Sequence, residues 1–452
     1  MIKSCEIKPR IGWRWIDSEV VVFNCENQII LIWNETASLL WEKIFEGGDF
    51  GDLVKFLTKN YSISEKRARK DVVNFYQDAQ FYGFIKYSNK NSHFRTKDQQ
   101  RWHNEEGENT LLDIEMKSIE KKIPFAITFE TTYACNENCI HCYMDRNLPA
   151  LTTQRIKEIL NEIAALGCLF VSFTGGEFFA RNDALEIIEH ASDLHFVIDI
   201  LSNGTLITKE IAHSISKHPV RRIQLSLYGA TSESHDHVTR LPGSFLKTVE
   251  CIQILSKYGV KVEIAVPLMN INFHERYAIK ILAESLNCLI SPSPIITARN
   301  NGSKDTFNLR LKDSQFKEFL EDEDFSALYS GRKPFQDHQF YFKSLNIMDA
   351  APCYSGFNSC AITPSGKVLP CNQLIYEVGD LKTNSFSEIW HNSKQLKYLR
   401  SLKISDLTEC SNCKNLLSCA RCPGLAFLEG GDIMGPSREN CRMTEISCSL
   451  QR

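Results

Sequence analysis

Long apolar runs are absent from this chain of 452 residues: no stretch approaches the roughly 18 consecutive apolar residues of a membrane-spanning helix. The opening residues, MIKSCEIKPR, lack the apolar core of a secretory signal. Basic residues are not in excess either, because the formal net charge is −3. A protein that coats nucleic acid needs a concentrated basic surface. We therefore expect a cytoplasmic protein with neither a membrane nor a nucleic acid as partner.

Cysteine, by contrast, is abundant, with 17 in the sequence. Disulfides are rare in a large intracellular chain whose thiols are kept reduced. Three cysteines lie within eight residues, from Cys135 to Cys142, and nine more fall between Cys353 and Cys448. This clustering predicts metal ligation. The remaining cysteines stand alone and are interpreted as core residues: Cys5, Cys25, Cys168, Cys251 and Cys288.

Residues 1–87 are predicted to form a small α+β domain. Three strand-like runs, EIKPRIGWRWI, EVVVF and QIILIW, precede three amphipathic stretches, the last of which has apolar residues at helical spacing. This order of elements predicts a winged-helix-like domain. Residues 88–122 are rich in Asn, Lys, Glu and Gln and are interpreted as a linker with room for one helix.

Residues 123–300 alternate between strand-like and helical patterns. The six strand-like runs are FAITFE, LFVSFT, FVIDILS, RRIQLSLY, VKVEIAVPL and CLISPSPII. Alternating β and α units predict an α/β fold with a parallel sheet, and six units fit a partial (β/α)6 barrel of the TIM type. Residues 301–345 are polar and are predicted to bridge to a cysteine-rich terminal domain over 346–452.

Candidate motifs follow four successive strands of the predicted barrel. They are Cys135 after the first, Gly175-Gly176-Glu177 after the second, Ser202-Asn203-Gly204 after the third and Ser226 at the end of the fourth. The carboxyl ends of barrel strands meet at one rim, where barrel enzymes carry their chemistry. We therefore expect these residues to form one site.

The spacing Cys135-x3-Cys139-x2-Cys142 supplies three thiolates from one loop. A cubane 4Fe–4S cluster takes four ligands, so three cysteines would leave one iron open to a small molecule. Zinc is the alternative, but it usually requires Cys-x2-Cys pairs and a fourth ligand, and none lies nearby in the sequence.

This spacing resembles the defining motif of the radical S-adenosylmethionine (SAM) superfamily. The resemblance covers roughly 123–300 and extends to FTGGE, SNGT and SLYG. It implies a 4Fe–4S cluster on Cys135, Cys139 and Cys142 as the catalytic centre, with SAM bound to its open iron through amine and carboxylate. One electron would break a carbon–sulfur bond of SAM, and the 5′-deoxyadenosyl radical so formed would remove a hydrogen from an unactivated carbon.

The same resemblance implies the residues that bind SAM. Gly175 and Gly176 let the backbone approach it, and Glu177 holds its ammonium group. The other implied contacts are Ser226 and Arg240 with the carboxylate, Asn203 near the ribose, and the backbone of His141 at the adenine. The alternative is structural, because a Ser or Asn at a strand end is often a cap and a surface Arg is often only solvated.

The terminal cysteines resemble the SPASM domain, the two-cluster extension of radical SAM enzymes that modify peptides and proteins. By position, the resemblance implies a first auxiliary cluster on Cys353, Cys360, Cys371 and Cys422, and a second on Cys410, Cys413, Cys419 and Cys441. Some relatives leave the site of Cys360 open for substrate. The spacing of Cys419 and Cys422, two residues where the family usually has three, departs from the pattern. Cys448 is expected to be spare, and a zinc ribbon is the alternative.

The N-terminal domain has two interpretations. A winged helix suggests DNA binding, but residues 1–95 carry 14 Lys plus Arg against 12 Asp plus Glu, which is weak for tracking phosphates. The element order and the segment WNETASLLWEKIFEGG instead resemble PqqD and the RiPP recognition elements. Such modules bind a leader peptide as an added strand, here expected at Gln28–Trp33.

Together these resemblances imply a radical SAM maturase with three 4Fe–4S clusters that crosslinks a ribosomally made precursor peptide, with a thioether favoured. A carbon–carbon crosslink and a protein-modifying oxidase of the sulfatase-maturing type are the alternatives, and a redox-sensing DNA-binding protein is a remote one. The expected partners are the precursor peptide and a reductant such as flavodoxin or ferredoxin.

Overall fold

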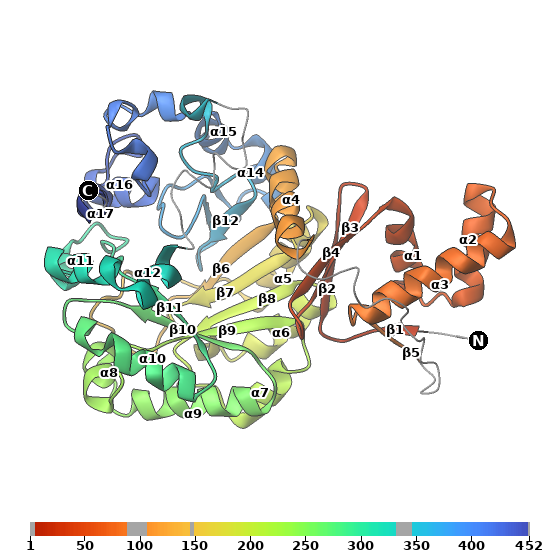
Figure 1. Cartoon of the computed structure of the whole chain (residues 1–452), viewed down its shortest axis with the longest axis horizontal. Coiled ribbons are helices and arrows are strands. Elements are labelled where there is room, and N and C mark those ends of the chain that lie inside the picture. Colours follow the sequence, from red (N-terminus) through yellow and green to blue (C-terminus); the bar gives the residue numbers. More distant parts are fainter. Residues whose placement is uncertain (1–4, 88–105, 145–148, 331–345, 451–452) are drawn as a thin grey trace.

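The computed structural model describes residues 5–87, 106–144, 149–330 and 346–450. Three parts lie side by side in Figure 1: an N-terminal α+β domain, a central sheet flanked by helices, and a C-terminal region of short helices and strands. None of the helices within these ranges is long and apolar enough to cross a membrane.

The N-terminal domain has the predicted order of strands followed by three helices. Its first strand-like run divides in two, because Pro9 has no N–H to continue a ladder. Polar side chains cap the helices, with Asn34 before the first, an Asp49–Asp52 capping box at the second and Ser64 before the third. The elements are β1 (Cys5–Ile7) paired with β5 (Ile85–Tyr87), an antiparallel sheet of β2 (Ile11–Ile16), β3 (Glu19–Asn24) and β4 (Ile29–Trp33), and α1 (Glu35–Phe45), α2 (Phe50–Tyr61) and α3 (Glu65–Phe81).

Both faces of this small sheet are buried. One face, with Val20, Val22 and Trp33, packs on the three helices. The other face, with Val21 and Phe23, packs on residues of the central sheet and of helix α4 (Glu106–Lys121): Ile114, Phe125, Leu169 and Val197. The alternation of apolar side chains along β3 therefore serves two separate cores.

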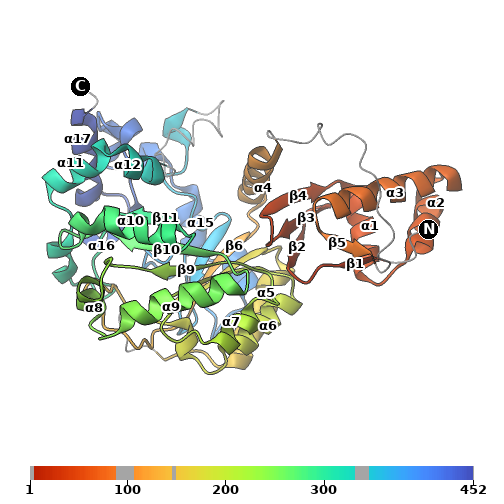
Figure 2. The ribbon, with the colours of Figure 1, turned by 60° about the horizontal axis from the view of Figure 1, so that its bottom comes forward.

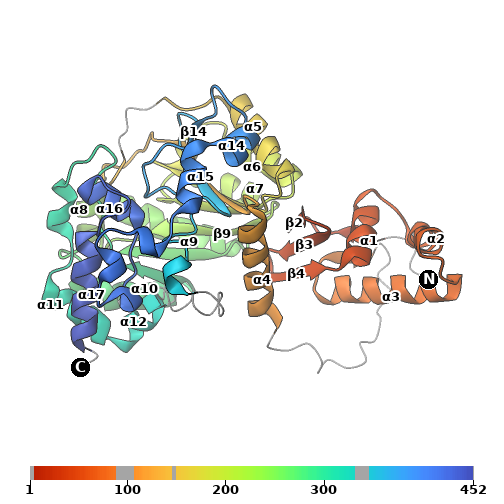
Figure 3. The same cartoon turned by 90° about the horizontal axis from the view of Figure 1, so that it is seen from above.

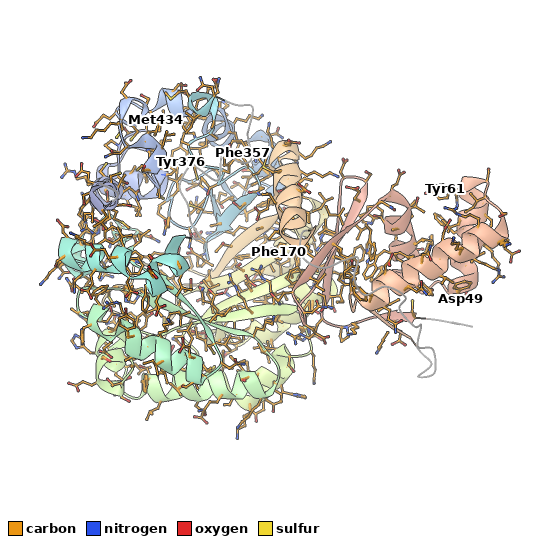
Figure 4. The ribbon with its side chains drawn as sticks, in the orientation of Figure 1. Asp49, Tyr61, Phe170, Phe357, Tyr376 and Met434 are labelled. Carbon is orange, nitrogen blue, oxygen red and sulfur yellow. The ribbon has the colours of Figure 1, made fainter. Side chains whose placement is uncertain are left out.

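Strand β2 fixes the domain to the central part. Arg14 donates hydrogen bonds to the carbonyls of Cys168 (2.8 Å) and Leu194 (2.7 Å), and the Trp13 ring stacks on His195. A Cβ at Gly12 would lie 2.4 Å from a methyl carbon of Val197, so this close approach requires glycine. Phe170 lies at the same boundary in Figure 4. The N-terminal domain is therefore packed onto the central part of the chain rather than tethered to it.

The six predicted barrel strands all form and run parallel, in the order β11-β10-β9-β8-β7-β6. Helices cover their outer face (Figure 2). The strands are β6 (Ala126–Thr132), β7 (Phe170–Gly175), β8 (Val197–Ser202), β9 (Val220–Ser226), β10 (Val262–Pro267) and β11 (Leu289–Ser293); the helices are α5 (Thr153–Ala165), α6 (Ala184–Asp193), α7 (Lys209–Ile215), α8 (Ser232–Thr239), α9 (Ser244–Lys257) and α10 (Arg276–Ser285). The predicted α/β class and partial barrel are confirmed.

The sheet does not end at β6, which the sequence pattern did not predict. Strand β12 (Ser359–Ile362) pairs in parallel with β6, and β13 (Lys367–Leu369) and β14 (Gly379–Asp380) follow, so the sheet has nine strands within the described ranges. Figure 1 shows β12 beside β6. The C-terminal region is therefore continuous with the barrel through backbone hydrogen bonds.

Helices complete the C-terminal half. Residues 301–330 of the predicted bridge form α11 (Asp313–Glu321) and α12 (Glu323–Ser330), and 331–345 lie outside the described residues. Arg310, just before α11, pairs with Glu429 (2.7 Å) and Glu439 (3.2 Å) in a largely buried network. The last helices are α14 (Phe386–Asn392), α15 (Lys394–Ser401), α16 (Pro423–Gly430) and α17 (Arg438–Leu450).

Candidate active site

A cavity of about 310 Å³ lies at the carboxyl ends of the barrel strands. Its lining comes from the cysteine loop after β6, from the ends of β7 to β11, and from the segment after β13. The lining residues include Cys135, Cys139, Cys142, His141, Tyr143, Gly175, Gly176, Asn203, Ser226, Tyr228, Asn300, Asn372 and Gln373. The convergence of strand ends expected from the sequence is thus realised.

The three motif cysteines are neighbours in this loop. Burial raises the pKa of the Cys139 thiol, and the nearby charges of Glu137, Cys142 and Cys135 raise it further. Helix α8 holds the loop from behind, since Asn138 and Ile140 donate their N–H groups to the carbonyls of Thr239 and Val238. The loop therefore places three cysteine sulfurs in one backbone turn.

Gly175 and Gly176 bring the end of β7 against this loop. A Cβ at Gly175 would lie 2.0 Å from the carbonyl oxygen of Thr132, and one at Gly176 would lie 2.4 Å from that of Ala134. Gly175 also has φ +135°, which favours glycine. The Gly176 N–H donates to Thr132 (2.7 Å). These glycines fix the position of the cysteine loop as well as lining the cavity.

The Glu177 carboxylate is fully buried and does not line the cavity. It accepts hydrogen bonds from the Phe179 N–H (2.9 Å), the Asn203 N–H (2.7 Å) and the Ser202 hydroxyl (2.9 Å). Burial raises its pKa, and these donors oppose that rise. The contacts make Glu177 a support for the turn after β8, and its predicted contact with the SAM ammonium stays a prediction.

The other predicted contacts divide into two groups. Ser226 and Asn203 line the cavity, and the Asn203 side chain donates to Asn136 (2.9 Å) beside Cys135. Arg240, in contrast, is exposed in a left-handed conformation after α8 and does not line the cavity. Asp236, in the stretch HDHVTR, accepts bonds from Gly243 and Phe245 at the start of α9 and therefore acts as a helix cap.

His141 provides a test of whether a ligand fits. Its ring lines the cavity beside Tyr228 (centroids 4.8 Å apart), and its buried Nδ1 has no hydrogen-bond partner among the described residues. Burial lowers the pKa of His141 to about 4, so the ring is neutral. A buried polar atom without a partner is costly, and a bound polar molecule would satisfy it. Three thiolates, an open cavity and this nitrogen fit a 4Fe–4S cluster with SAM.

Three of the four cysteines predicted for the first auxiliary cluster are near one another, and their role as ligands stays a prediction. Burial raises the pKa of Cys371 to about 11, with a contribution from the charge of Cys353 and a smaller one from Cys422, so the three thiols are close. Cys360 lies instead on β12, opposite Ile127, where it is buried in the core near Cys168 and Arg400. The structure does not bring Cys360 to the predicted cluster, because β12 joins the barrel sheet and turns this side chain into the core.

All four cysteines predicted for the second auxiliary cluster are near one another, and their role as ligands stays a prediction. The charges of Cys410 and Cys413 act on Cys419, and all three act on Cys441. No three His, Cys, Asp or Glu side chains within the described ranges are close enough for a single metal ion. A cubane distributes its ligands over four irons and therefore uses a wider spacing.

Sequence reasoning missed several residues of the cavity wall. Tyr143 follows the last motif cysteine, and Asn372 and Gln373 follow Cys371. Asn300 donates its N–H to the Tyr143 carbonyl (2.8 Å). Glu130 lies behind this wall as a carboxyl buried near the end of β6. An acidic residue within the strand-like run FAITFE was a sequence signal that could have identified it.

The pKa of Glu130 yields a stability prediction. Burial raises this pKa from 4.5 to about 7, so the native state holds a proton that the unfolded chain has lost. Native stability should therefore fall as pH rises between those values, by at most about 3 kcal/mol. Glu130→Gln has no such proton. Its thermal stability relative to the parent protein should therefore be greater at about pH 8 than at about pH 6. Thermal unfolding at both pH values measures this, and an equal difference at both would contradict it.

Three family models match the chain in the predicted order. The PqqD model (coenzyme PQQ synthesis protein D) matches 19–85, the Radical SAM superfamily model matches 129–281, and the SPASM iron–sulfur cluster-binding model matches 353–414. The chain is a radical SAM enzyme. More particularly, it is a radical SAM oxidoreductase with a SPASM domain and a PqqD-like N-terminal domain, so SAM and iron–sulfur clusters are its cofactors.

The individual proteins that this chain is similar to share a low sequence identity with it. The AdoMet-dependent heme synthase of Methanosarcina barkeri is 27% identical over 69% of this chain and 94% of its own length. The mycofactocin maturase MftC of Mycolicibacterium smegmatis is 27% identical over 70% of this chain and 82% of its own. Streptococcus suis SuiB bound to its precursor peptide SuiA has a TM-score of 0.61 at 14% identity, covering 97% of this chain and 99% of SuiB, which supports the fold.

Proposed function

We propose that this enzyme is a maturase that crosslinks a ribosomally synthesised precursor peptide, with a thioether as the favoured bond. The observation that carries the proposal is the PqqD-like domain, packed onto the same barrel whose rim holds the cavity. When bound, SAM and its cluster supply a 5′-deoxyadenosyl radical that takes a hydrogen atom from the peptide. The chain contributes cysteines for that cluster and for two auxiliary ones, three 4Fe–4S clusters in total.

The first auxiliary group favours a thioether over a carbon–carbon bond. Only Cys353, Cys371 and Cys422 of its predicted ligands lie together, so a cubane there would have one iron without a cysteine. The neighbouring Gln373 lines the cavity, and its side-chain oxygen Oε1 lies 3.7 Å from the Cys422 sulfur. A substrate cysteine in the cavity would thus find a soft, thiolate-preferring site beside it. A carbon–carbon crosslink is the second candidate.

The N-terminal domain distinguishes this proposal from enzymes without a leader-binding module. The Methanosarcina heme synthase and the maturase MftC match 69% and 70% of this chain, so both matches leave about a third of it unaligned. The SuiB–SuiA structure, in contrast, covers almost all of this chain. The PqqD match also favours peptide over DNA as the ligand of this domain. A cytoplasmic flavodoxin or ferredoxin is the proposed reductant.

Strand β4 is the proposed docking edge, since it pairs only with β3 among the described strands. Its free backbone groups follow from the register. The Cys25 N–H donates to the Arg10 carbonyl on the β2 side, so Val22, three residues earlier, directs its backbone groups to β4 and exchanges hydrogen bonds with its partner Leu31. The next residue, Ile32, therefore directs its N–H and C=O away from β3. A leader strand would bond to Ile32.

Replacing Ile32 by proline should weaken precursor binding by at least about tenfold, because it removes a donor from the docking edge. Proline is tolerated on an edge strand whose N–H faces outward. Ile32→Ala is the matched control, since it removes the side chain but keeps the N–H. Fluorescence anisotropy of a labelled precursor measures the affinity, and SAM cleavage without peptide should be unchanged in both variants.

Equal affinities of Ile32→Pro and Ile32→Ala would indicate that the leader binds elsewhere. Point changes are preferable to removing residues 1–87, because that deletion would expose Phe125, Leu169 and Val197 of the barrel core.

A further inference from the structure

A second cavity, of about 420 Å³, lies at the amino ends of the barrel strands, away from the cysteine loop. Helix α4 forms one wall with Leu112 and Met116, and the first residues of β6 and β7 form another. Ile114, two positions from each of those α4 residues, faces the other way and packs in one cluster with Ile30 of β4. Figure 3 shows α4 between β4 and the C-terminal region. One face of α4 therefore borders the strand with the docking edge, and the other borders the second cavity.

The second cavity and the active-site cavity share one face of the barrel sheet. Along β7, Ser172 lines the second cavity and Thr174 lines the active-site cavity. Along β8, the corresponding residues are Asp199 and Leu201. Side chains two residues apart on a strand point to the same face. This face is the inner one, because the alternate residues of both strands pack under the outer helices.

A chain of polar contacts runs along this inner face from one cavity to the other. The Gln224 side chain, in the active-site cavity, donates to Glu263 (2.8 Å), and Glu263 pairs with Arg222. Nε of Arg222 lies 3.4 Å from Oδ2 of Asp199, which lines the second cavity. The Arg222 side chain is 39% exposed, so this part of the interior is open. Barrel interiors are usually filled by branched apolar side chains. An open, polar interior can instead accept an extended peptide backbone.

The docking edge and the active-site cavity belong to opposite ends of the barrel. The sheet that contains β4 packs on Phe125, Leu169 and Val197, each at or just before the start of a barrel strand, whereas the cysteine loop follows a strand end. Strand β7 has six residues, so the two ends are about 20 Å apart. A peptide bound to β4 must cover this length before its core reaches the cysteine loop.

We propose that the second cavity binds the precursor segment between leader and core, as an extended chain with an apolar side chain in the cavity. The inference rests on the proposed function and adds a binding site to it. Position identifies the occupant, because the cavity lies beside α4, next to the docking strand, and continues along the inner face to the active-site cavity. The wall offers apolar contacts from Leu112, Met116 and Phe170, and hydroxyls of Ser172 and Ser359 that can bond a peptide backbone.

The first test compares Leu112→Lys with Asp113→Lys in the reconstituted holoenzyme. Asp113 is the next residue of α4, is exposed and does not line the cavity. The probes are two labelled peptides, the full precursor encoded beside the enzyme and its leader alone. Leu112→Lys should weaken binding of the full precursor by at least about tenfold, because it places a charge against an apolar wall, and should leave leader affinity unchanged. Asp113→Lys should change both affinities by at most about twofold. Fluorescence anisotropy measures the affinities, with thermal unfolding as the control for folding.

Shortening the precursor is an independent test. A path along β7 requires about six extended residues between the leader strand and the core. A precursor with only about three residues there should keep its leader affinity, but crosslinked peptide per deoxyadenosine should fall by at least about tenfold. Lengthening the same segment should preserve crosslinking.

Three results would overturn this binding site: equal losses for both peptides in Leu112→Lys, no loss for either peptide, and normal crosslinking of the shortened precursor. Equal losses would indicate that the change disturbs the docking edge, and no loss would leave the cavity to another ligand. A parent enzyme that cleaves SAM but leaves every precursor's mass unchanged would instead overturn the proposed function.

Discussion

Alanine at Cys135, Cys139 and Cys142 together should lower the iron content by about four atoms per chain and abolish SAM cleavage. These cysteines are neighbours in one loop, and no other cysteine lines the cavity. The loop is held by α8 and by Gly176 through backbone groups, which the substitutions leave in place. The auxiliary clusters should therefore remain. Iron analysis and chromatography of deoxyadenosine under reducing, anaerobic conditions measure both effects.

Cys288→Ala is the matched control for this variant. Cys288 is partly buried before β11 and lies outside all three cysteine groups, so iron and SAM cleavage should stay at the parent level. Deoxyadenosine production by the triple variant would refute the assignment of the SAM-binding cluster.

Cys371→Ala and Cys422→Ala should separate SAM cleavage from crosslinking. Both cysteines belong to the first auxiliary group, beside the wall formed by Asn372 and Gln373. If that cluster takes the electron that crosslinking releases, its loss should leave deoxyadenosine formation in place while the crosslinked product disappears. Peptide mass should then no longer fall by two hydrogens. Both quantities are measured on the same reaction.

Cys360→Ala provides the control that distinguishes ligation from packing. Cys360 is buried in the barrel core, so this change should lower stability by about 1 kcal/mol and leave iron and crosslink yield intact. A loss of about four iron atoms per chain in Cys360→Ala would instead identify Cys360 as a cluster ligand. A folded Cys371→Ala protein that still crosslinks at near-normal yield would exclude the electron-acceptor role.

Local patterns in the sequence were sufficient for the elements and for bringing most of the predicted metal ligands close together. The six barrel strands follow from apolar runs, and residues such as Asn34, Asp49 and Ser64 mark helix starts by side-chain chemistry that acts within three residues. Cys135, Cys139 and Cys142 are neighbours because they lie in one short loop. The same holds for Cys410, Cys413 and Cys419, which turns of one segment bring together.

Tertiary structure decided the residues whose partners lie far away in the chain. Cys360 resembles a ligand by position, but its pairing across β12 and β6 directs it into the core. Glu177 and Arg240 fit a motif by spacing, but only the structure shows that the Glu177 carboxylate bonds to the turn after β8 and that Arg240 is exposed at the end of α8; their contacts with SAM stay predictions. Spacing constrains only groups within a few residues of one another, whereas burial, and the free energy that depends on it, is set by segments that meet only when the chain has folded.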